Sequence, residues 1–441
     1  MNIKKIISNY NLLSKNKLLL FLRNNPESLS LKILSEIAEM VNSNRLKTAA
    51  YYTDEATTKY LSNLLPDIDS ETIRILEPSV GIGNLLPILF DKYSNKRKVI
   101  LDLIDIDLNS LSILKELNRY RNIPDNFVIR YHNVDFFDFE KNFQYDLIIG
   151  NPPFLLKGKV ENWHKISKDL NDNISTNLSS LFLQQSLLHS KNVLLIMPKY
   201  FLSNNNFALC RERVKQYEIN SIVDLGEHGF KGVLIETIAI SINTVNSPST
   251  TNVYSVNKGI KNQIKQTELT DVNLPNWILY RNDFFDSIYE KMITNVFEVT
   301  RDRAIHNKDL NYDGKGVRVL KSRNISRTTN EIIDIPGYDA YIATEVLNGK
   351  NIKKYRYETN VYLTPNMTYY PRVVKKPNDC VVNGSVAILK NTSNYEIKKK
   401  HIDFWNSKVF EEFYAIAMNY STRSLNIDSR SIKYFGLYEG D

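Results

Sequence analysis

Cysteine and long apolar runs are scarce in this chain of 441 residues. Cys210 and Cys380 are its only cysteines, which excludes a disulfide framework and a cysteine-based zinc site and favours a reducing compartment. The longest apolar stretches, such as 193–197, are much shorter than the roughly 18 residues that a membrane-spanning helix needs. The N-terminus, Met-Asn-Ile-Lys-Lys, lacks the apolar region of a signal peptide. We therefore expect a cytoplasmic protein that does not contact membranes.

The glycine motifs that bind phosphate groups are also missing. The chain contains neither Gly-x-Gly-x-x-Gly nor a Gly-Lys-Ser/Thr ending, which argues against the common dinucleotide and nucleoside triphosphate sites. Instead, a predicted strand at 73–76 leads into Glu77-Pro78-Ser-Val-Gly81-Ile-Gly83 and then into a helix. The glycines allow a sharp turn and close approach to a ligand, while Glu77 can accept hydrogen bonds from an ammonium or hydroxyl group. Because a carboxylate repels phosphate, the turn favours an uncharged or cationic nucleoside. A plain strand–helix turn is the alternative.

The net charge of +8 is concentrated in one region of the chain. Residues 315–400 contain sixteen Lys and Arg against seven Asp and Glu, a net charge of +9, so the remainder carries 41 − 42 = −1. The same window holds eight tyrosines. Basic residues interleaved with aromatic ones suit a surface that contacts phosphates and stacks on bases, and Lys375 and Lys376 are candidate contacts. A solvated basic face is the alternative.

Hydropathy patterns divide the chain into three parts. Residues 1–48 are predicted to form a helical extension. From 49 to 245, short β-rich runs alternate with helical segments, which predicts an α/β domain with a mostly parallel sheet and helices on both faces. A polar stretch at 243–251 predicts a linker, and residues 246–441 are expected to form a separate α+β module. The expected strands of the α/β domain are 73–76, 99–106, 145–149, 193–197 and 221–225, with a strand or half a hairpin at 233–243.

Carboxylates follow two later segments of the α/β domain. Asp105-Ile106-Asp107 ends a predicted strand twenty-two residues after Gly83, where an open α/β sheet places the group that holds ribose hydroxyls. Either aspartate could instead cap the next helix. Further on, Asp135 could accept a hydrogen bond from an adenine amino group and Phe136 could cover the face of the ring, although Phe136 could equally be a core residue.

The most specific pattern is Asn151-Pro152-Pro153-Phe154, which follows a buried strand. The two prolines fix φ and remove two backbone donors, so the loop presents carbonyl groups and the Asn151 amide. Such acceptors can hold both hydrogens of an exocyclic amino group and direct its lone pair towards an electrophile, while Phe154 stacks on the ring. A rigid turn after a strand is the alternative.

These motifs together resemble a known enzyme family. The order Tyr51-Tyr-Thr53, Glu77 to Gly83, Asp105-Ile-Asp107, Asp135-Phe136 and Asn151-Pro-Pro-Phe154 is similar to the gamma-class S-adenosylmethionine-dependent N6-adenine DNA methyltransferases of restriction–modification systems. The likeness covers about 48–245 well and the rest more loosely. It implies a Rossmann-like catalytic domain at 49–245 and a DNA target recognition domain at 246–441.

The resemblance also implies a role for each matching position. Thr53 would contact the methionine part of S-adenosylmethionine, although it could instead cap a helix. Val80 and Ile82 stand where the family commonly has small residues, and Phe154 stands where many members have tyrosine. Phe230 resembles a later motif near the flipped base, with core packing as the alternative. The implied cofactor positions are Thr53, Glu77, Pro78, Gly81, Gly83, Asp105, Ile106, Asp135 and Phe136, and the implied target-adenine positions are Asn151, Pro152, Pro153 and Phe154.

The expected function is methyl transfer to the N6 amino group of a flipped-out adenine in a specific duplex DNA sequence. We expect a monomeric modification enzyme with no metal site, and a separate cognate restriction endonuclease that acts on the same sequence. Three alternatives stay open. These are an RNA adenine methyltransferase, a protein glutamine methyltransferase, and a combined nuclease and methyltransferase in which Asp379, Glu396 and Lys398 would form a metal site.

Overall fold

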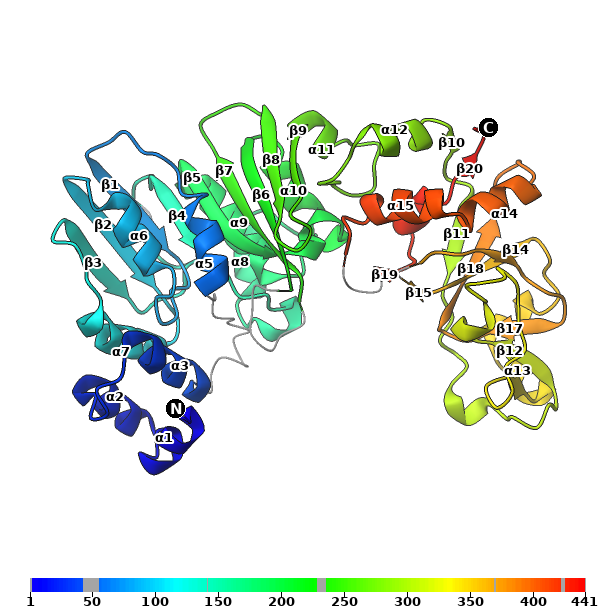
Figure 1. The fold of residues 1–441 in the computed structure, drawn as a ribbon, viewed down its shortest axis with the longest axis horizontal. Coiled ribbons are helices and arrows are strands. Elements are labelled where there is room, and N and C mark those ends of the chain that lie inside the picture. The colour runs from blue at the N-terminus through cyan, green and yellow to red at the C-terminus, as the bar shows by residue number, and fades with distance from the viewer. Residues whose placement is uncertain are drawn as a thin grey trace. The chain divides into compact units, whose positions relative to one another are not determined.

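The computed structural model describes residues 2–42, 55–140, 142–227, 235–368, 370–421 and 425–440. The chain forms two compact units, Met1–Asp271 and Val272–Asp441 (Figure 1). Within the described residues, no helix has the length and apolar character needed to cross a membrane.

A nine-stranded sheet forms the frame of the first unit (Figure 1). Its strand order is β3-β2-β1-β4-β5-β7-β6-β8-β9. The neighbouring strands β3, β2, β1, β4 and β5 pair in parallel, whereas β7 is antiparallel to both β5 and β6. The predicted mostly parallel sheet is therefore confirmed. The strands are β1 (Thr72–Glu77), β2 (Lys98–Ile104), β3 (Phe127–His132), β4 (Leu147–Gly150), β5 (Asn192–Pro198), β6 (Glu218–Gly226), β7 (Thr237–Asn243), β8 (Thr250–Ser255) and β9 (Lys261–Lys265).

Alternating side chains of each strand enter two different cores, as the pleat of a strand requires. In β1, Ile73 and Ile75 belong to one apolar cluster, which includes residues of the helix that follows β1. Leu76 points the other way, into a cluster with residues of the helices that follow β4. Both faces of the sheet are therefore covered by helices. These helices are α5 (Glu55–Ser62), α6 (Leu86–Tyr93), α7 (Leu108–Leu117), α8 (Trp163–Asp169), α9 (Leu178–His189) and α10 (Ala208–Val214).

A group of N-terminal helices precedes α5. Helices α1 (Ile3–Asn9), α2 (Lys15–Asn24) and α3 (Leu31–Val41) share an apolar cluster with Ile82 of the glycine turn and with Ile113 and Leu117 of α7. The N-terminal helices therefore pack against the turn that follows β1.

The first unit extends beyond the expected domain boundary at 245. The polar stretch predicted as a linker is a turn, in which the Asn243 side chain accepts hydrogen bonds from the backbone N–H groups of Val245 and Asn246 at 2.9 Å. Strands β8 and β9 then add to the sheet, and helix α11 (Gln266–Leu269) precedes the end of the unit at Asp271. Turn-forming residues fit a linker and a strand connection equally well, so the pairing of β8 with β6 was not visible in the sequence.

The second unit combines short helices with four small sheets. One core lies between its strands, and an aromatic core surrounds Trp405, whose indole N–H donates to the carbonyl of Gly436 at 2.9 Å. The α+β character expected for this region is confirmed. Its strands are β10 (Met292–Ile293), β11 (Phe297–Thr300), β12 (Val317–Leu320), β13 (Ala340–Ile342), β14 (Val361–Pro365), β15 (Met367–Thr368), β16 (Val374–Lys375), β17 (Cys380–Val382), β18 (Val386–Asn391), β19 (Leu425–Asn426) and β20 (Leu437–Tyr438), and its helices are α12 (Asp283–Tyr289), α13 (Thr344–Asn348), α14 (Lys399–Trp405) and α15 (Lys408–Ala417).

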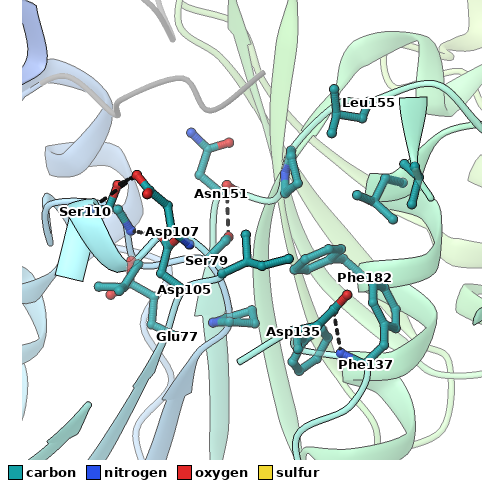
Figure 2. A pocket seen from close by; sticks show the side chains of 18 of the residues that line it. Glu77, Ser79, Asp105, Asp107, Ser110, Asp135, Phe137, Asn151, Leu155 and Phe182 are labelled. Atoms are coloured by element: carbon teal, nitrogen blue, oxygen red, sulfur yellow. Dashed lines mark hydrogen bonds between the residues drawn. The ribbon is translucent and has the colours of Figure 1, made fainter. Parts of the chain in front are cut away.

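The carboxyl ends of β1, β2 and β4 meet at one edge of the large sheet, because neighbouring parallel strands point the same way. Glu77, Asp105 and Asn151 therefore lie together at this edge, although the sequence separates them widely (Figure 2).

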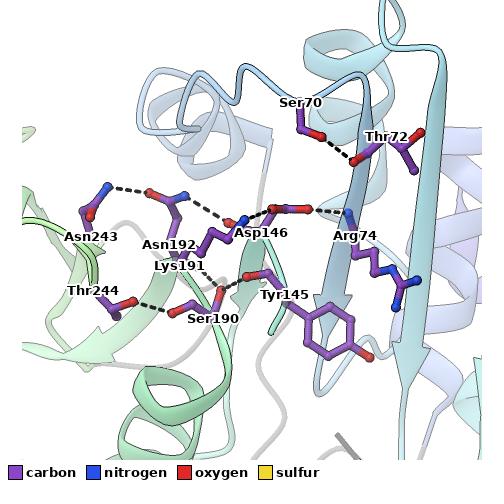
Figure 3. A network of polar contacts seen from close by, with 10 residues as sticks. All are labelled: Ser70, Thr72, Arg74, Tyr145, Asp146, Ser190, Lys191, Asn192, Asn243 and Thr244. Atoms are coloured by element: carbon purple, nitrogen blue, oxygen red, sulfur yellow. Dashed lines mark hydrogen bonds and ion pairs between the residues drawn. The ribbon is translucent and has the colours of Figure 1, made fainter. Parts of the chain in front are cut away.

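A polar network fastens the opposite, amino-terminal edge of the same strands (Figure 3). The buried Asp146, just before β4, accepts a hydrogen bond from the backbone N–H of Arg74 in β1 at 2.9 Å. Its other carboxylate oxygen pairs with Lys191 Nζ at 2.9 Å, and its carbonyl accepts from Asn192 of β5 at 2.9 Å. The side chain and the carbonyl of this one residue thus link β1, β4 and β5 at the edge opposite the candidate site.

The substitution Asp146→Ala should destabilise this edge of the sheet by about 1–3 kcal/mol, because it leaves the partly buried backbone N–H of Arg74 without its acceptor. Hydrogen exchange of the β1 and β4 amides reports the free energy of local opening and would measure the loss. The matched control is Asp125→Ala, at an exposed aspartate of the same unit, which should change this free energy by less than about 0.5 kcal/mol. Equal effects of the two substitutions would contradict the role given to Asp146.

Candidate functional site

A cavity of about 560 Å³ opens at the carboxyl ends of β1, β2 and β4. This volume lies within the range of about 300–1,000 Å³ that is typical of small-molecule sites. Figure 2 shows Glu77, Asp105 and Asp107 gathered on one side of the cavity and Phe137 and Phe182 on the other. The cavity therefore has an acidic wall and an aromatic wall.

The cavity brings together most of the residues that the sequence singled out. Gly83, Pro152 and Phe154 are not among its lining residues. Thr53 and Phe230 lie outside the described residues. The expected site residues that line the cavity are Glu77, Pro78, Gly81, Asp105, Ile106, Asp135, Phe136, Asn151 and Pro153.

The glycine turn owes its shape to two different requirements. Gly81 has a φ of 56°, and its backbone N–H donates to Asp105 Oδ2 at 2.8 Å. Gly83 has a φ of 79°, and a Cβ atom there would lie 2.6 Å from Leu114 Cδ1 of α7. Gly81 therefore faces the cavity, whereas Gly83 allows the turn to pack on α7. The large residues Val80 and Ile82, which differ from the family pattern, are both buried in apolar clusters.

The two aspartates after β2 have separate roles. Asp107 caps α7, because its side chain accepts from the backbone N–H groups of Asn109 at 3.1 Å and Ser110 at 3.3 Å. Asp105 accepts from the N–H groups of Gly81 and Asp107, both at 2.8 Å. Burial raises the pKa of Asp105 to about 6, even though these two hydrogen bonds oppose the increase. Asp105 is thus fixed in position, and its carboxyl group ionises at a pH just below neutral.

Glu77 is the most deeply buried carboxylate of the cavity. It is 2% exposed, and its Oε2 atom has no hydrogen-bond partner among the described residues. Burial raises the pKa of Glu77 well above its usual value, the positive charge of Arg121 lowers it, and the charge of Asp105 raises it. Arg121 is held under the turn by a hydrogen bond to the carbonyl of Ile82 at 2.9 Å. An unsatisfied buried oxygen of this kind is suited to accept a hydrogen bond from a cationic ligand.

The aromatic wall contains residues that the sequence patterns did not reveal. Phe136 is 2% exposed and stacks on Phe182 of α9, with ring centroids 5.1 Å apart. Asp135 accepts from the backbone N–H of Phe137 and from the Asn162 side chain, each at 3.0 Å. Phe136 is therefore both a core residue and part of the cavity wall. Phe182 and Asn162 reach the cavity only through tertiary packing, and no local motif marks them.

The N-terminal helices also contribute to the cavity. Asn42, which follows α3, lines it and donates through its side-chain amide to Ser110 Oγ at 3.1 Å. Ser110 in turn donates to Asp107 Oδ2 at 2.9 Å. No motif in the sequence pointed to Asn42.

The Asn151 loop is joined directly to the glycine turn. Ser79 Oγ donates to the backbone carbonyl of Asn151 at 3.2 Å. A Cβ atom on Gly150 would lie 3.2 Å from Cδ of Pro78, so the two loops pack closely. Phe154 is 7% exposed and belongs to an apolar core, and its carbonyl accepts from the Asn177 side chain at 3.3 Å. Asn151 and Pro153 therefore face the cavity, while Phe154 anchors the loop in the core.

The basic window of the second unit is only partly available as a surface. Lys376 is buried, and its Nζ donates to the carbonyls of Arg356 at 2.9 Å and Pro377 at 2.8 Å. The interpretation of Lys376 as a DNA contact is therefore wrong, whereas Lys375 on β16 is exposed. Asp379 pairs with Arg356. Among the described residues, no three His, Cys, Asp or Glu side chains gather as metal ligands would.

Known proteins resemble this chain in sequence and in fold. Residues 12–230 match the sequence model of the Eco57I restriction-modification methylase family. A type IIL restriction-modification enzyme, MmeI, solved in complex with DNA, is similar over 83% of this chain and 66% of its own, with 11% identity and a TM-score of 0.56. The likeness in fold to that enzyme extends over most of this chain.

Two further solved structures overlap with about half of this chain. A protein from Listeria monocytogenes assigned as a class I S-adenosylmethionine-dependent methyltransferase is 17% identical over 52% of this chain and 74% of its own, with a TM-score of 0.41. A modification subunit assigned to a type I restriction enzyme from Vibrio vulnificus is 14% identical over 55% of this chain, with a TM-score of 0.40. The match spans 52% of that subunit's length. The match to the Eco57I restriction-modification methylase family covers 219 of the 441 residues, just under half of the chain.

Proposed function

We propose that this protein transfers a methyl group from S-adenosylmethionine to the N6 amino group of an adenine within a specific duplex DNA sequence. The observation that carries the proposal is the contact between the Asn151 loop and the glycine turn, which brings Asn151 to the wall of a cavity of about 560 Å³. The fold shared with an enzyme solved in complex with DNA supports duplex DNA as the substrate.

The cavity residues fit S-adenosylmethionine. The unsatisfied Oε2 atom of Glu77 suits the cationic methionine part, and Asp105 suits the ribose hydroxyls. Ile106 lines the cavity and is 67% exposed, so its side chain is available to pack on a ligand. Asp135 and Phe136, which line the same cavity, would hold the adenine ring. When bound, the cofactor would supply an electrophilic methyl group.

The chain's own contribution to the chemistry is to orient the target nitrogen. The Asn151 amide oxygen and the carbonyl of Pro152 would accept the two hydrogens of the N6 amino group, which directs the nitrogen lone pair towards the cavity. A strong base is not required, because the nitrogen becomes acidic once it is alkylated. The extra proton can then pass to water.

The target adenine must leave the helical stack to reach Asn151, at a cost of a few kcal/mol. The second unit, Val272–Asp441, would supply the contacts that select the DNA sequence. It corresponds to most of the recognition domain expected at 246–441. The protein would act as a monomer, alongside a separate endonuclease that cuts the same sequence when it is unmodified.

The substitution Asn151→Ala should abolish methyl transfer while cofactor binding survives. Loss of one preorganised polar contact to the reacting group typically slows turnover by about 10²–10³-fold. Single-turnover transfer of labelled methyl groups to DNA, followed by sequencing of the modified base, would measure both the rate and the base. Isothermal titration would measure cofactor affinity.

The matched control for this experiment is Asn122→Ala, an exposed asparagine of the same unit, which should leave both quantities unchanged. Unchanged turnover in the Asn151 variant would contradict the role proposed for Asn151 in methyl transfer. Methylation of cytosine in place of adenine would agree with the proposed mechanism but contradict adenine as the target base.

Cofactor affinity should increase as the pH rises through about 6. Burial raises the pKa of Asp105 to about 6, and its ionised form is the one that can accept two ribose hydroxyls. Below that pH, protonation competes with binding, so Kd should rise by up to about tenfold per pH unit. Titration calorimetry between about pH 5 and pH 8 would measure this dependence.

In the Asp105→Asn variant, binding should be weaker throughout and the change in affinity near pH 6 should be lost. The Asp125→Asn control, at an exposed aspartate, should keep the profile of the unmodified protein. A flat profile in the unmodified protein would refute the link between Asp105 ionisation and binding.

A further inference from the structure

A loop of fixed shape follows β12 in the second unit. Asn324, which is fully buried, donates through its side-chain amide to the carbonyl of Ile333 at 3.1 Å and to Asp339 Oδ1 at 2.6 Å. Its side-chain oxygen accepts from the backbone N–H of Lys321 at 3.0 Å. The two arms of the loop also pair through a bridge between Ile325 and Ile332. One buried amide therefore fixes the path of residues 321–333.

The loop presents cations that lie against tyrosine rings. Arg327 Cζ lies 3.3 Å from the ring centroid of Tyr370, and Arg323 Cζ lies 5.5 Å from that of Tyr338. At 3.3 Å a guanidinium must lie flat on the ring, because an edge-on approach would force its nitrogens into the ring atoms. The N–H groups of Arg327 consequently point outward along the plane of the ring. Both Arg327 and Tyr370 are exposed.

These cations lack the acidic partners found elsewhere in the basic window. Arg318 pairs with Asp334, and Arg356 pairs with Asp379. In the described part of the chain, by contrast, Arg327 makes neither an ion pair nor a hydrogen bond through its side chain.

A second arginine lies beside Arg327. Arg372 is held by hydrogen bonds to the carbonyls of Ile325 at 3.0 Å and Tyr370 at 3.3 Å. Burial lowers the pKa of Arg372, and the neighbouring positive charge of Arg327 lowers it further. The repulsion between these two positive charges decreases when a polyanion binds. We call Arg323, Arg327, Tyr370 and Arg372 the Arg327 patch.

We propose that Arg327 recognises a guanine in the duplex DNA substrate, while Arg323 and Arg372 contact neighbouring phosphates. The inference rests on the proposed function, since it names the residue that selects one base of the target sequence. A guanidinium edge with two parallel N–H groups matches the O6 and N7 acceptors of guanine in the major groove. Stacking on Tyr370 fixes the orientation of the guanidinium before DNA binds, which lowers the entropic cost of recognition.

The test compares methylation of a library of duplexes that carry every base at each position of the target sequence. The full-length R327A and R327K variants should lose about 10- to 100-fold of the preference for guanine at one position and keep the other preferences. R327K retains the positive charge. A loss of the guanine preference in this variant would therefore mean that the preference depends on the two parallel N–H groups of the guanidinium. The matched control K375A, at an exposed lysine on β16, should preserve every base preference.

Cofactor affinity and the thermal unfolding midpoint should be unchanged in both Arg327 variants, because this side chain is exposed. Unaltered base preferences in R327A would overturn the inference. Uniformly weaker binding to all sequences with a shallower salt dependence would also overturn it, because Arg327 would then be a phosphate contact. In either case the proposed function would stand as long as the unmodified protein methylates adenine. Absence of transfer by the unmodified protein to any duplex would instead refute the proposed function.

Discussion

The hydrogen bond between Ser79 and the carbonyl of Asn151 is the contact on which the candidate site depends. It joins the turn after β1 to the turn after β4, and the close packing of Pro78 on Gly150 prevents the two from separating. Parallel pairing of neighbouring strands brings these turns to one edge of the sheet, but pairing alone would not fix their separation. The contact therefore converts two loops into a single wall, with the carboxylates proposed to bind the cofactor on one side and the proposed amino-group acceptor, Asn151, on the other.

The buried acidic groups of this wall favour ligands that carry positive charge. Glu77 and Asp105 both line the cavity, burial raises the pKa of each, and the charge of Asp105 raises the pKa of Glu77 further. Arg121 offsets part of this cost from beneath the turn, although burial lowers the pKa of Arg121 itself to about 10. A ligand that brings positive charge and hydroxyl donors would satisfy the carboxylates, whereas a phosphate would add a third negative group. The exclusion of phosphate ligands inferred from the sequence thus has a physical cause in the structure.

The sequence predicted the elements that depend on local pattern and missed those that depend on distant packing. The strand before Asn151 and the turn at Gly81 follow from apolar runs and from glycine and proline, so their positions could be anticipated. Strand β3 was missed because only three consecutive apolar residues, 127–129, precede its charged and polar ones at the edge of the sheet.

Roles that depend on side-chain direction were harder to predict. The sequence could not show that Gly83 makes room for Leu114, that Phe154 turns into the core, or that Lys376 is buried against carbonyl groups. Each of these facts depends on a partner far away in the chain or on the path of a loop. The role of Asp107 was open between ligand and helix cap, and the geometry of α7 decides for the cap.

The path of the loop depends on the buried amide of Asn324 and not on the exposed side chains that the loop carries. The hydrogen bonds that hold residues 321–333 involve backbone groups and side chains such as those of Asn324, Asp339 and Arg372. Among the described residues, none of these bonds uses the side chain of Arg323 or Arg327. Those two positions can therefore change without altering the path of the chain. Under the role proposed for Arg327, exchange of these exposed residues would change the base that is selected, while the scaffold that carries them stays the same.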